Sequence, residues 1–150
     1  MSEGTDERWM RRAIELAQLC PPAAQAYSVG AVIIGEDGRE IASGYSREGD
    51  PQVHAEESAL AKLPAKDPRL ATATLYSTLE PCSRRASRPS PCAQLILDAG
   101  IPRVVIAWRE PSLFVEDCIG VALLAEHGVE VIELTELAEA AMEPNRHLAI

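Results

Sequence analysis

Three residues of types that bind zinc stand in two short segments of this 150-residue chain. His54 lies in the run Val-His-Ala-Glu-Glu, and Cys82 and Cys92 lie in a run rich in proline and arginine that begins at Thr78. Imidazole nitrogen and thiolate sulfur are preferred zinc ligands, and three protein ligands leave the fourth tetrahedral position for water. Bound zinc can lower the pKa of that water to about 7, so the pattern predicts a hydroxide nucleophile at neutral pH.

A carboxylate two residues after His54 could serve as the proton carrier of such a site. We interpret Glu56 as the group that takes a proton from the water and delivers it to the substrate, rather than as a fourth ligand. Its neighbour Glu57 offers a competing carboxylate. The spacing from His54 favours Glu56, and spacing alone leaves Glu57 open.

Two other readings of the same residues remain. They could form a closed structural zinc site within a non-catalytic, zinc-stabilised interaction module, or they could be an ordinary core histidine and two buried thiols. Structural zinc sites usually close with a fourth Cys or His, and none lies near these segments. Cys20 and Cys118 could join only through long-range folding, and we interpret them as small buried apolar side chains.

The elements that must position these residues alternate between helix and strand. Apolar periodicity predicts helices at 5–19, 54–63, 92–99, 120–127 and 135–142, and strands at 29–34, 40–43, 73–78, 103–108 and 129–134. His54 and Cys92 would thus each begin a helix, where free N–H groups and the positive dipole end favour a thiolate and a bound metal. Thr135 is expected to cap the last helix.

The order of these elements predicts the fold class. Strands and helices that alternate after an initial hairpin favour an α/β fold, in which helices cover both faces of a mixed five-stranded sheet. A helix joins the last two strands, so these strands should be parallel neighbours with a right-handed crossover. The length suits one domain spanning residues 1–150.

Composition narrows the classes of partner. The formal net charge of −9 disfavours nucleic acid as a partner, because an acidic surface repels phosphate backbones. No apolar run approaches the roughly 20 residues that cross a bilayer, and the first residues are polar and unlike a signal peptide. We therefore expect a cytoplasmic protein without a membrane partner.

The two segments resemble the His-x-Glu and Pro-Cys-x-x-Cys signature of zinc deaminases. Here nine residues, not two, separate Cys82 from Cys92. The wide gap is similar to that of the deaminase domain of riboflavin-biosynthesis pyrimidine deaminases, within the cytidine-deaminase-like superfamily. Further shared runs are Val29-Gly30-Ala31-Val32, Gly44-Tyr45, Thr78 to Ser83, Pro91-Cys92-Ala93, Ala99-Gly100-Ile101 and Asn145-Arg146.

The resemblance implies a three-layer α/β/α sandwich, one zinc per subunit and hydrolytic loss of ammonia. We also expect a homodimer. The family's reductase domain has no counterpart in residues 1–150. Two substrate-contact positions depart from the family: Ala26 replaces an Asn that faces the ribose-phosphate part of the substrate, and Ser46 replaces a His.

Other residues are candidates for new substrate contacts. Arg88, with Arg84 and Arg85 in the loop between the cysteines, could hold an anionic group of the substrate. Trp108 and Phe114 border a strand end and could stack on a planar ring. The predicted substrate is a small pyrimidine-like heterocycle with an exocyclic amine, as a base, nucleoside, nucleotide or specialised metabolite. The alternative is the diaminopyrimidine ribosyl phosphate of riboflavin synthesis itself.

Overall fold

A computed structural model of the chain describes residues 2–21, 23, 26–82, 91–109 and 119–148. The helices are α1 (Ser2–Ala17), α2 (Ala55–Ala61), α3 (Cys92–Ala99), α4 (Gly120–Glu126) and α5 (Ala138–Met142). The strands are β1 (Gly30–Ile34), β2 (Glu40–Tyr45), β3 (Thr74–Leu79), β4 (Arg103–Trp108) and β5 (Glu130–Glu133). Short 3-10 turns are η1 (Pro68–Thr72), η2 (Thr135–Leu137) and η3 (Glu143–Asn145). Among the described helices, none combines the length and the apolar character needed to span a bilayer.

The five strands form one mixed sheet in the order β2-β1-β3-β4-β5. β1 is antiparallel to both β2 and β3, whereas β3, β4 and β5 run parallel. The predicted parallel pairing of the last two strands is thus confirmed. In a parallel set the carboxyl ends of the strands meet at one edge, and here that edge carries Leu79 and Trp108 in register.

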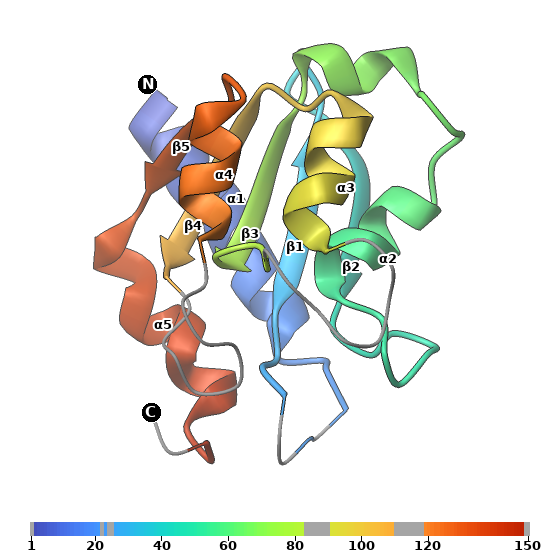
Figure 1. The fold of residues 1–150 in the computed structure, drawn as a ribbon. Coiled ribbons are helices and arrows are strands. Elements are labelled where there is room, and N and C mark those ends of the chain that lie inside the picture. The colour runs from blue at the N-terminus through green and yellow to red at the C-terminus, as the bar shows by residue number, and fades with distance from the viewer. Residues whose placement is uncertain (1, 22, 24–25, 83–90, 110–118, 149–150) are drawn as a thin grey trace.

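Helices pack on both faces of the sheet, which confirms the three-layer arrangement (Figure 1). Side chains alternate between these faces along each strand. On β3, the Tyr76 hydroxyl bonds Asp6 of α1, whereas the next residue, Ser77, bonds Glu56 of α2. The face that bears α2, α3 and α4 is therefore the one that carries the predicted chemistry.

Gly44 allows α2 to lie close against the sheet. A Cβ atom built on Gly44 would stand 2.6 Å from the Ala55 carbonyl oxygen and 2.7 Å from the Ala59 nitrogen. Both distances are shorter than any real contact of a Cβ atom, so only glycine permits this approach. The close contact fixes the start of α2, next to His54.

Several sequence-based boundaries differ from the structure by a few residues, and three of these differences bear on the fold. Thr135 does not cap a helix, because it opens η2 instead, and α5 begins only after Leu137 turns its buried side chain into the core. Gly44 and Tyr45 belong to β2 rather than to a loop, since both pair with β1. α1 ends at Ala17 rather than at the predicted residue 19, because the chain enters a tight turn there.

Candidate functional site

The zinc-binding residue types meet at the carboxyl edge of β3. His54 is the residue before α2, Cys82 follows the end of β3, and Cys92 is the first residue of α3. Figure 1 shows the starts of α2 and α3 beside the end of β3. His54 Nδ1 stands 3.6 Å from Cys82 Sγ and 3.3 Å from Cys92 Sγ, and all three ligand atoms lie within 4.8 Å of one another. The sequence alone does not show which ring nitrogen of His54 would bind zinc, and in the structure Nδ1 faces both thiols.

These distances fit a tetrahedral zinc ion. Zinc bonds of about 2.0–2.1 Å to nitrogen and about 2.3 Å to sulfur place a nitrogen and a sulfur ligand about 3.6 Å apart. Among the described residues the cluster holds three ligands and no fourth. Cys20 lies elsewhere, with its thiol directed at the Val29 carbonyl oxygen. A three-ligand set is the arrangement typical of catalytic rather than structural zinc.

The surroundings of Cys82 favour its thiolate form. The hydrogen bond with Cys92 is the largest influence and, together with His54, it outweighs burial and lowers the pKa of Cys82 to about 4. The backbone N–H of Cys92 also donates to Cys82 Sγ at 3.2 Å. This N–H belongs to the first turn of α3, where backbone N–H groups have no acceptor within the helix. The helix start therefore stabilises the Cys82 thiolate.

Glu56 is buried beside the cluster, with a relative exposure of 4%. Burial, reinforced by the negative charge of Cys82, raises the pKa of Glu56 above its ordinary value. The Ser77 hydroxyl has one proton and two acceptors in reach, Glu56 Oε2 at 3.2 Å and the Leu79 carbonyl at 2.9 Å. When Ser77 donates to the Leu79 carbonyl, its oxygen can accept a hydrogen bond from a protonated Glu56. The contact between Ser77 and Glu56 therefore accommodates both protonation states of the Glu56 carboxyl group.

Glu57, the competing carboxylate, has a different task. Its Oε1 accepts a hydrogen bond from the His54 backbone N–H at 3.2 Å, as part of a capping box at the start of α2. The side chain is only half-buried. This contact assigns Glu57 to positioning His54 and favours Glu56 as the proton carrier.

The start of α4 supports the loop that carries Cys82. Glu80 accepts a hydrogen bond from the Val121 N–H at 2.8 Å, and its own N–H donates to the Trp108 carbonyl at 2.9 Å. A Cβ atom on Gly120 would stand only 1.9 Å from the Pro81 carbonyl oxygen. The backbone around Cys82 is therefore set by close contacts as well as by hydrogen bonds.

The two positions that depart from the family lie in different environments. Ala26 is half-buried in the segment before β1. Ser46 is only 4% exposed, and its hydroxyl accepts from the Val29 N–H at 2.9 Å and lies 3.4 Å from the Val29 carbonyl. A substrate contact by Ser46 would have to compete with these internal bonds, so Ala26 is the more accessible of the two.

Trp108 stands at the carboxyl end of β4 on the same face of the sheet as Ser77, because the pairs Ser77–Ile106 and Leu79–Trp108 are in register. Its ring packs edge to face against Tyr27, with centroids 5.7 Å apart. The buried indole Nε1 has no hydrogen-bond partner among the described residues. Since buried N–H groups are rarely left unpaired, this donor is a candidate for a contact with substrate or water.

Arg84, Arg85, Arg88, Phe114 and Cys118 lie outside the described residues. Sequence reasoning missed Ser77 and Tyr27. Ser77 could have been noticed as a hydroxyl inside an otherwise buried strand, since such a group needs a polar partner. Tyr27 carries no comparable signal, because its contact with Trp108 joins residues that are far apart in sequence.

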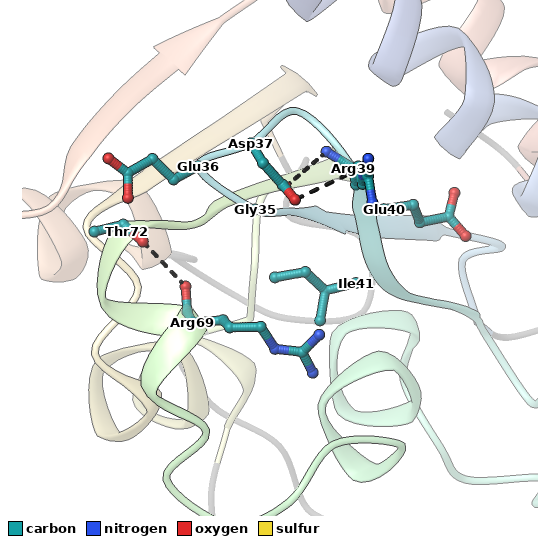
Figure 2. Close-up of a pocket in the computed structure, with 8 residues that line it drawn as sticks. All are labelled: Gly35, Glu36, Asp37, Arg39, Glu40, Ile41, Arg69 and Thr72. Carbon is teal, nitrogen blue, oxygen red and sulfur yellow. Dashed lines mark hydrogen bonds and ion pairs between the residues drawn. The ribbon is translucent and has the colours of Figure 1, made fainter.

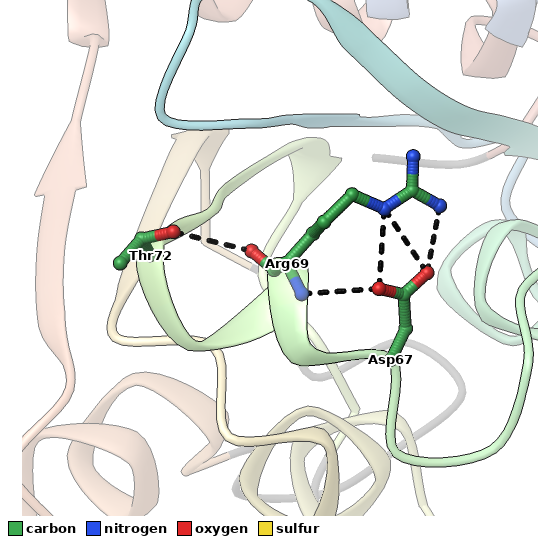
Figure 3. Close-up of polar contacts among 3 residues, drawn as sticks. All are labelled: Asp67, Arg69 and Thr72. Carbon is green, nitrogen blue, oxygen red and sulfur yellow. Dashed lines mark hydrogen bonds and ion pairs between the residues drawn. The ribbon is translucent and has the colours of Figure 1, made fainter.

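A hollow of about 520 Å³ lies at the opposite end of the sheet, around the turn between β1 and β2 (Figure 2). Its lining residues are Gly35, Glu36, Asp37, Arg39, Glu40, Ile41, Arg69 and Thr72. The Arg69 guanidinium is held by Asp67 at 2.7 Å, and the Thr72 hydroxyl donates to the Arg69 carbonyl at 3.4 Å (Figure 3). This hollow contains none of the candidate metal-binding residues, so it is not the site of the predicted chemistry.

Comparison with known proteins gives a consistent picture. The model of the cytidine and deoxycytidylate deaminase zinc-binding region matches residues 3–108. A diaminohydroxyphosphoribosylamino-pyrimidine deaminase of Schizosaccharomyces pombe is 43% identical over 85% of this chain and 31% of its own length. Riboflavin biosynthesis protein RibD of Escherichia coli is 36% identical over 90% of this chain and 35% of its own. The chain thus spans about a third of the length of these curated relatives.

Solved structures share the fold. A bifunctional deaminase and reductase from Thermotoga maritima superimposes with a TM-score of 0.79 at 36% identity, over 96% of this chain and 40% of that one. The Rib2 deaminase of Aspergillus oryzae gives a TM-score of 0.79 at 25% identity, over 92% and 89% of the two chains.

The matched model extends from α1 through β4 and includes His54, Glu56, Cys82 and Cys92. The cluster that His54, Cys82 and Cys92 form has the donor set and the spacing of a zinc site. On both grounds, this chain belongs to the cytidine and deoxycytidylate deaminase zinc-binding family.

Proposed function

We propose that this chain is a zinc-dependent hydrolytic deaminase that removes an exocyclic amine from a small pyrimidine-like heterocycle. The observation that carries the proposal is the cluster of His54, Cys82 and Cys92 with the buried Glu56 beside it. A non-catalytic zinc module would need the three ligands, but it would have no use for a buried carboxylate of raised pKa.

Each residue has a distinct task in the proposed reaction. His54 Nδ1 and the two thiolates would hold zinc, which supplies an activated water for attack on the carbon that bears the amine. The Glu56 carboxylate would take a proton from the attacking water and deliver it to a ring nitrogen, and it would then pass the second water-derived proton to the amine that leaves as ammonia. Ser77 orients Glu56 through Oε2.

The substrate has two candidates. Ala26 and Ser46 lack the polar groups that the family resemblance implies around a sugar phosphate, which favours another aminated heterocycle. The Schizosaccharomyces pombe relative, at 43% identity, favours the diaminopyrimidine ribosyl phosphate of riboflavin synthesis as the second candidate. Arg88 is proposed to hold an anionic group and Trp108 to contact the ring.

The setting of the reaction is also part of the proposal. We propose that residues 1–150 form one deaminase domain and that the enzyme is cytoplasmic, acts as a homodimer on a small molecule and has no nucleic-acid or membrane partner. The acidic charge of −9 supports the exclusion of nucleic acid.

A screen for ammonia release tests the proposed function. Zinc-loaded protein is incubated with amino-pyrimidines, amino-purines, their nucleosides and nucleotides, and the riboflavin intermediate. We expect release from at least one pyrimidine-type amine, loss of that release after chelation and recovery when zinc is restored. Zinc-loaded protein that releases ammonia from none of these compounds would support the interaction module instead. A kcat/KM of at least about 10⁴ M⁻¹s⁻¹ on the riboflavin intermediate would identify that compound as the substrate.

A further inference from the structure

Arg47 adopts a backbone conformation that residues with a side chain rarely take. Its φ angle is 63°, in the left-handed region that favours glycine. In this conformation its N–H donates to the Val53 carbonyl at 2.8 Å, directly beside His54. A glycine would adopt this turn without strain, so the presence of arginine points to a task for its side chain.

The Arg47 guanidinium bonds the segment between α1 and β1. Its Nε and Nη2 donate to the Pro21 carbonyl at 3.0 and 2.8 Å. Its Nη1 donates to the Tyr27 carbonyl at 3.1 Å, and Nη2 also donates to the Ser28 hydroxyl at 2.8 Å. All of these acceptors are uncharged, and burial lowers the pKa of Arg47. A partly buried cation with donors on Pro21, Tyr27 and Ser28 holds these three residues close to the turn at Arg47.

A second set of contacts holds the same stretch from the C-terminal side. Asn145 is fully buried, and it accepts from the Ser28 N–H at 2.5 Å and donates to the Ser28 carbonyl at 3.1 Å. The Ser46 hydroxyl bonds the neighbouring Val29 N–H at 2.9 Å. The backbone from Tyr27 to Val29 is thus fixed by side chains from two distant parts of the chain.

The fixed stretch lies next to the candidate active site. Tyr27 packs against Trp108, whose side chain emerges on the sheet face that carries Ser77 and Glu56. On its other side, Arg47 bonds Val53, the residue before His54. Arg47 therefore joins the loop that carries His54 to the segment that carries Ala26 and Tyr27.

We propose that Arg47 is a positioning residue for substrate binding, a role that rests on the proposed deaminase function. It holds Ala26 and Tyr27 against the active site without touching the metal or the reacting atoms. Ground-state binding and the choice among substrates then depend on Arg47, whereas zinc binding and proton transfer do not. A purely structural role would instead change stability without a selective change in KM.

The left-handed conformation supplies a clean variant, because Arg47→Gly removes the guanidinium and keeps the backbone unstrained. Lys66 is the matched control, since it is exposed, has a φ of 56° and lies between α2 and η1, in a segment that supplies none of the candidate site residues. Arg47→Lys keeps the charge and three donors on one ammonium, and it tests for partial rescue. All variants are compared with the wild type for zinc content, thermal midpoint, and kcat and KM on the amine that the wild type deaminates fastest.

We expect Arg47→Gly to raise KM about tenfold or more while kcat stays within about threefold, as for lost ground-state binding. Zinc content should match the wild type, Lys66→Gly should behave as the wild type, and Arg47→Lys should lie between. An unchanged KM overturns the inference, as does a loss of kcat or of zinc without a rise in KM.

Amide hydrogen exchange keeps the test separate from the proposed function. Arg47→Gly should exchange the Ser28 and Val29 amides about tenfold faster or more, because local opening becomes easier. Unchanged exchange overturns the inference whether or not the protein is active. Wild-type protein that deaminates no amine refutes the proposed function, and faster exchange would then leave Arg47 only a structural role, which also overturns the inference.

Discussion

Glu56 and Glu57 are adjacent carboxylates with opposite surroundings. Glu56 is buried beside the thiolates and bonds Ser77, whereas Glu57 bonds the backbone N–H of His54 at the start of α2. Environment rather than residue type therefore separates the proposed proton carrier, Glu56, from the capping residue, Glu57. The same holds for the cysteines, because Cys82 has a lowered pKa and burial raises the pKa of Cys20.

At the residue scale, Cys82→Ala should abolish zinc binding. The thiolate is one of only three ligands in the described cluster, and even changes to the hydrogen-bond partners of zinc ligands cost about 10–100-fold in affinity. We expect an affinity loss of more than about 100-fold, measured by competition with a chromophoric chelator. Cys20→Ala is the control and should retain full zinc. A Cys82→Ala protein with stoichiometric zinc would exclude this ligand assignment.

The elements position the site through a few close contacts. Gly44 lets α2 approach the sheet, and Gly120 lets α4 approach the loop after β3. On the other face, Asp6 of α1 bonds Tyr76 of β3 at 2.6 Å and Arg103 of β4 at 2.7 Å. These contacts fix α1, α2 and α4 relative to the sheet, near the end of β3 where the candidate zinc ligands meet.

At the element scale, Gly120→Ala should push the Pro81 carbonyl away and disturb Cys82. The added Cβ would stand 1.9 Å from that oxygen. Overpacking of this kind costs about 1–3 kcal/mol, and part of the cost should appear as weaker zinc binding. Gly4→Ala in α1 is the control, because a Cβ atom there meets nothing within 4 Å. Equal zinc affinity in both variants would contradict a role for α4 in shaping the loop that carries Cys82.

The contact between α1 and the sheet should make stability depend on acid. Burial alone would raise the pKa of Asp6, but hydrogen bonds from Arg103 and Tyr76 outweigh it and hold the pKa below 3.8. Asp6 therefore binds a proton more readily in the unfolded chain than in the folded one. Its contribution to stability is complete above the pKa of Asp6 in the unfolded chain and is lost as pH falls through its pKa in the folded protein.

Asp6→Asn should therefore lower the free energy of unfolding at pH 7 by about 1–3 kcal/mol, as for lost hydrogen bonds to charged groups. The difference from the wild type should shrink below a pH of about 4. Urea unfolding at both pH values measures this. Glu7→Gln removes an exposed ion pair with Arg11 and should have little effect. If the difference in unfolding free energy between Asp6→Asn and the wild type grew in acid, the pKa of Asp6 would be raised in the folded protein rather than lowered.

Across the whole molecule, the features that depend on local sequence pattern were the ones that could be predicted best. The strands β4 and β5 and the start of α3 follow from apolar periodicity, and His54, Glu56 and the two cysteines follow from spacing. Thr135 was misread because a buried Leu137 imposes a tight turn that propensity does not encode. The contacts that shape the substrate side remained invisible, since Asn145 meets Ser28 across 117 positions.

One bound zinc and Glu56 are together proposed to make this chain a deaminase. The most direct measurement titrates zinc into metal-depleted protein and records bound zinc and ammonia release in the same samples. We expect release to rise in proportion to bound zinc and to saturate at about one zinc per chain. Glu56→Gln should bind the same zinc and lose about 10²–10⁴-fold in turnover, whereas Glu57→Gln should lose far less. Ammonia release by the metal-free protein, or full turnover in Glu56→Gln, would contradict the account.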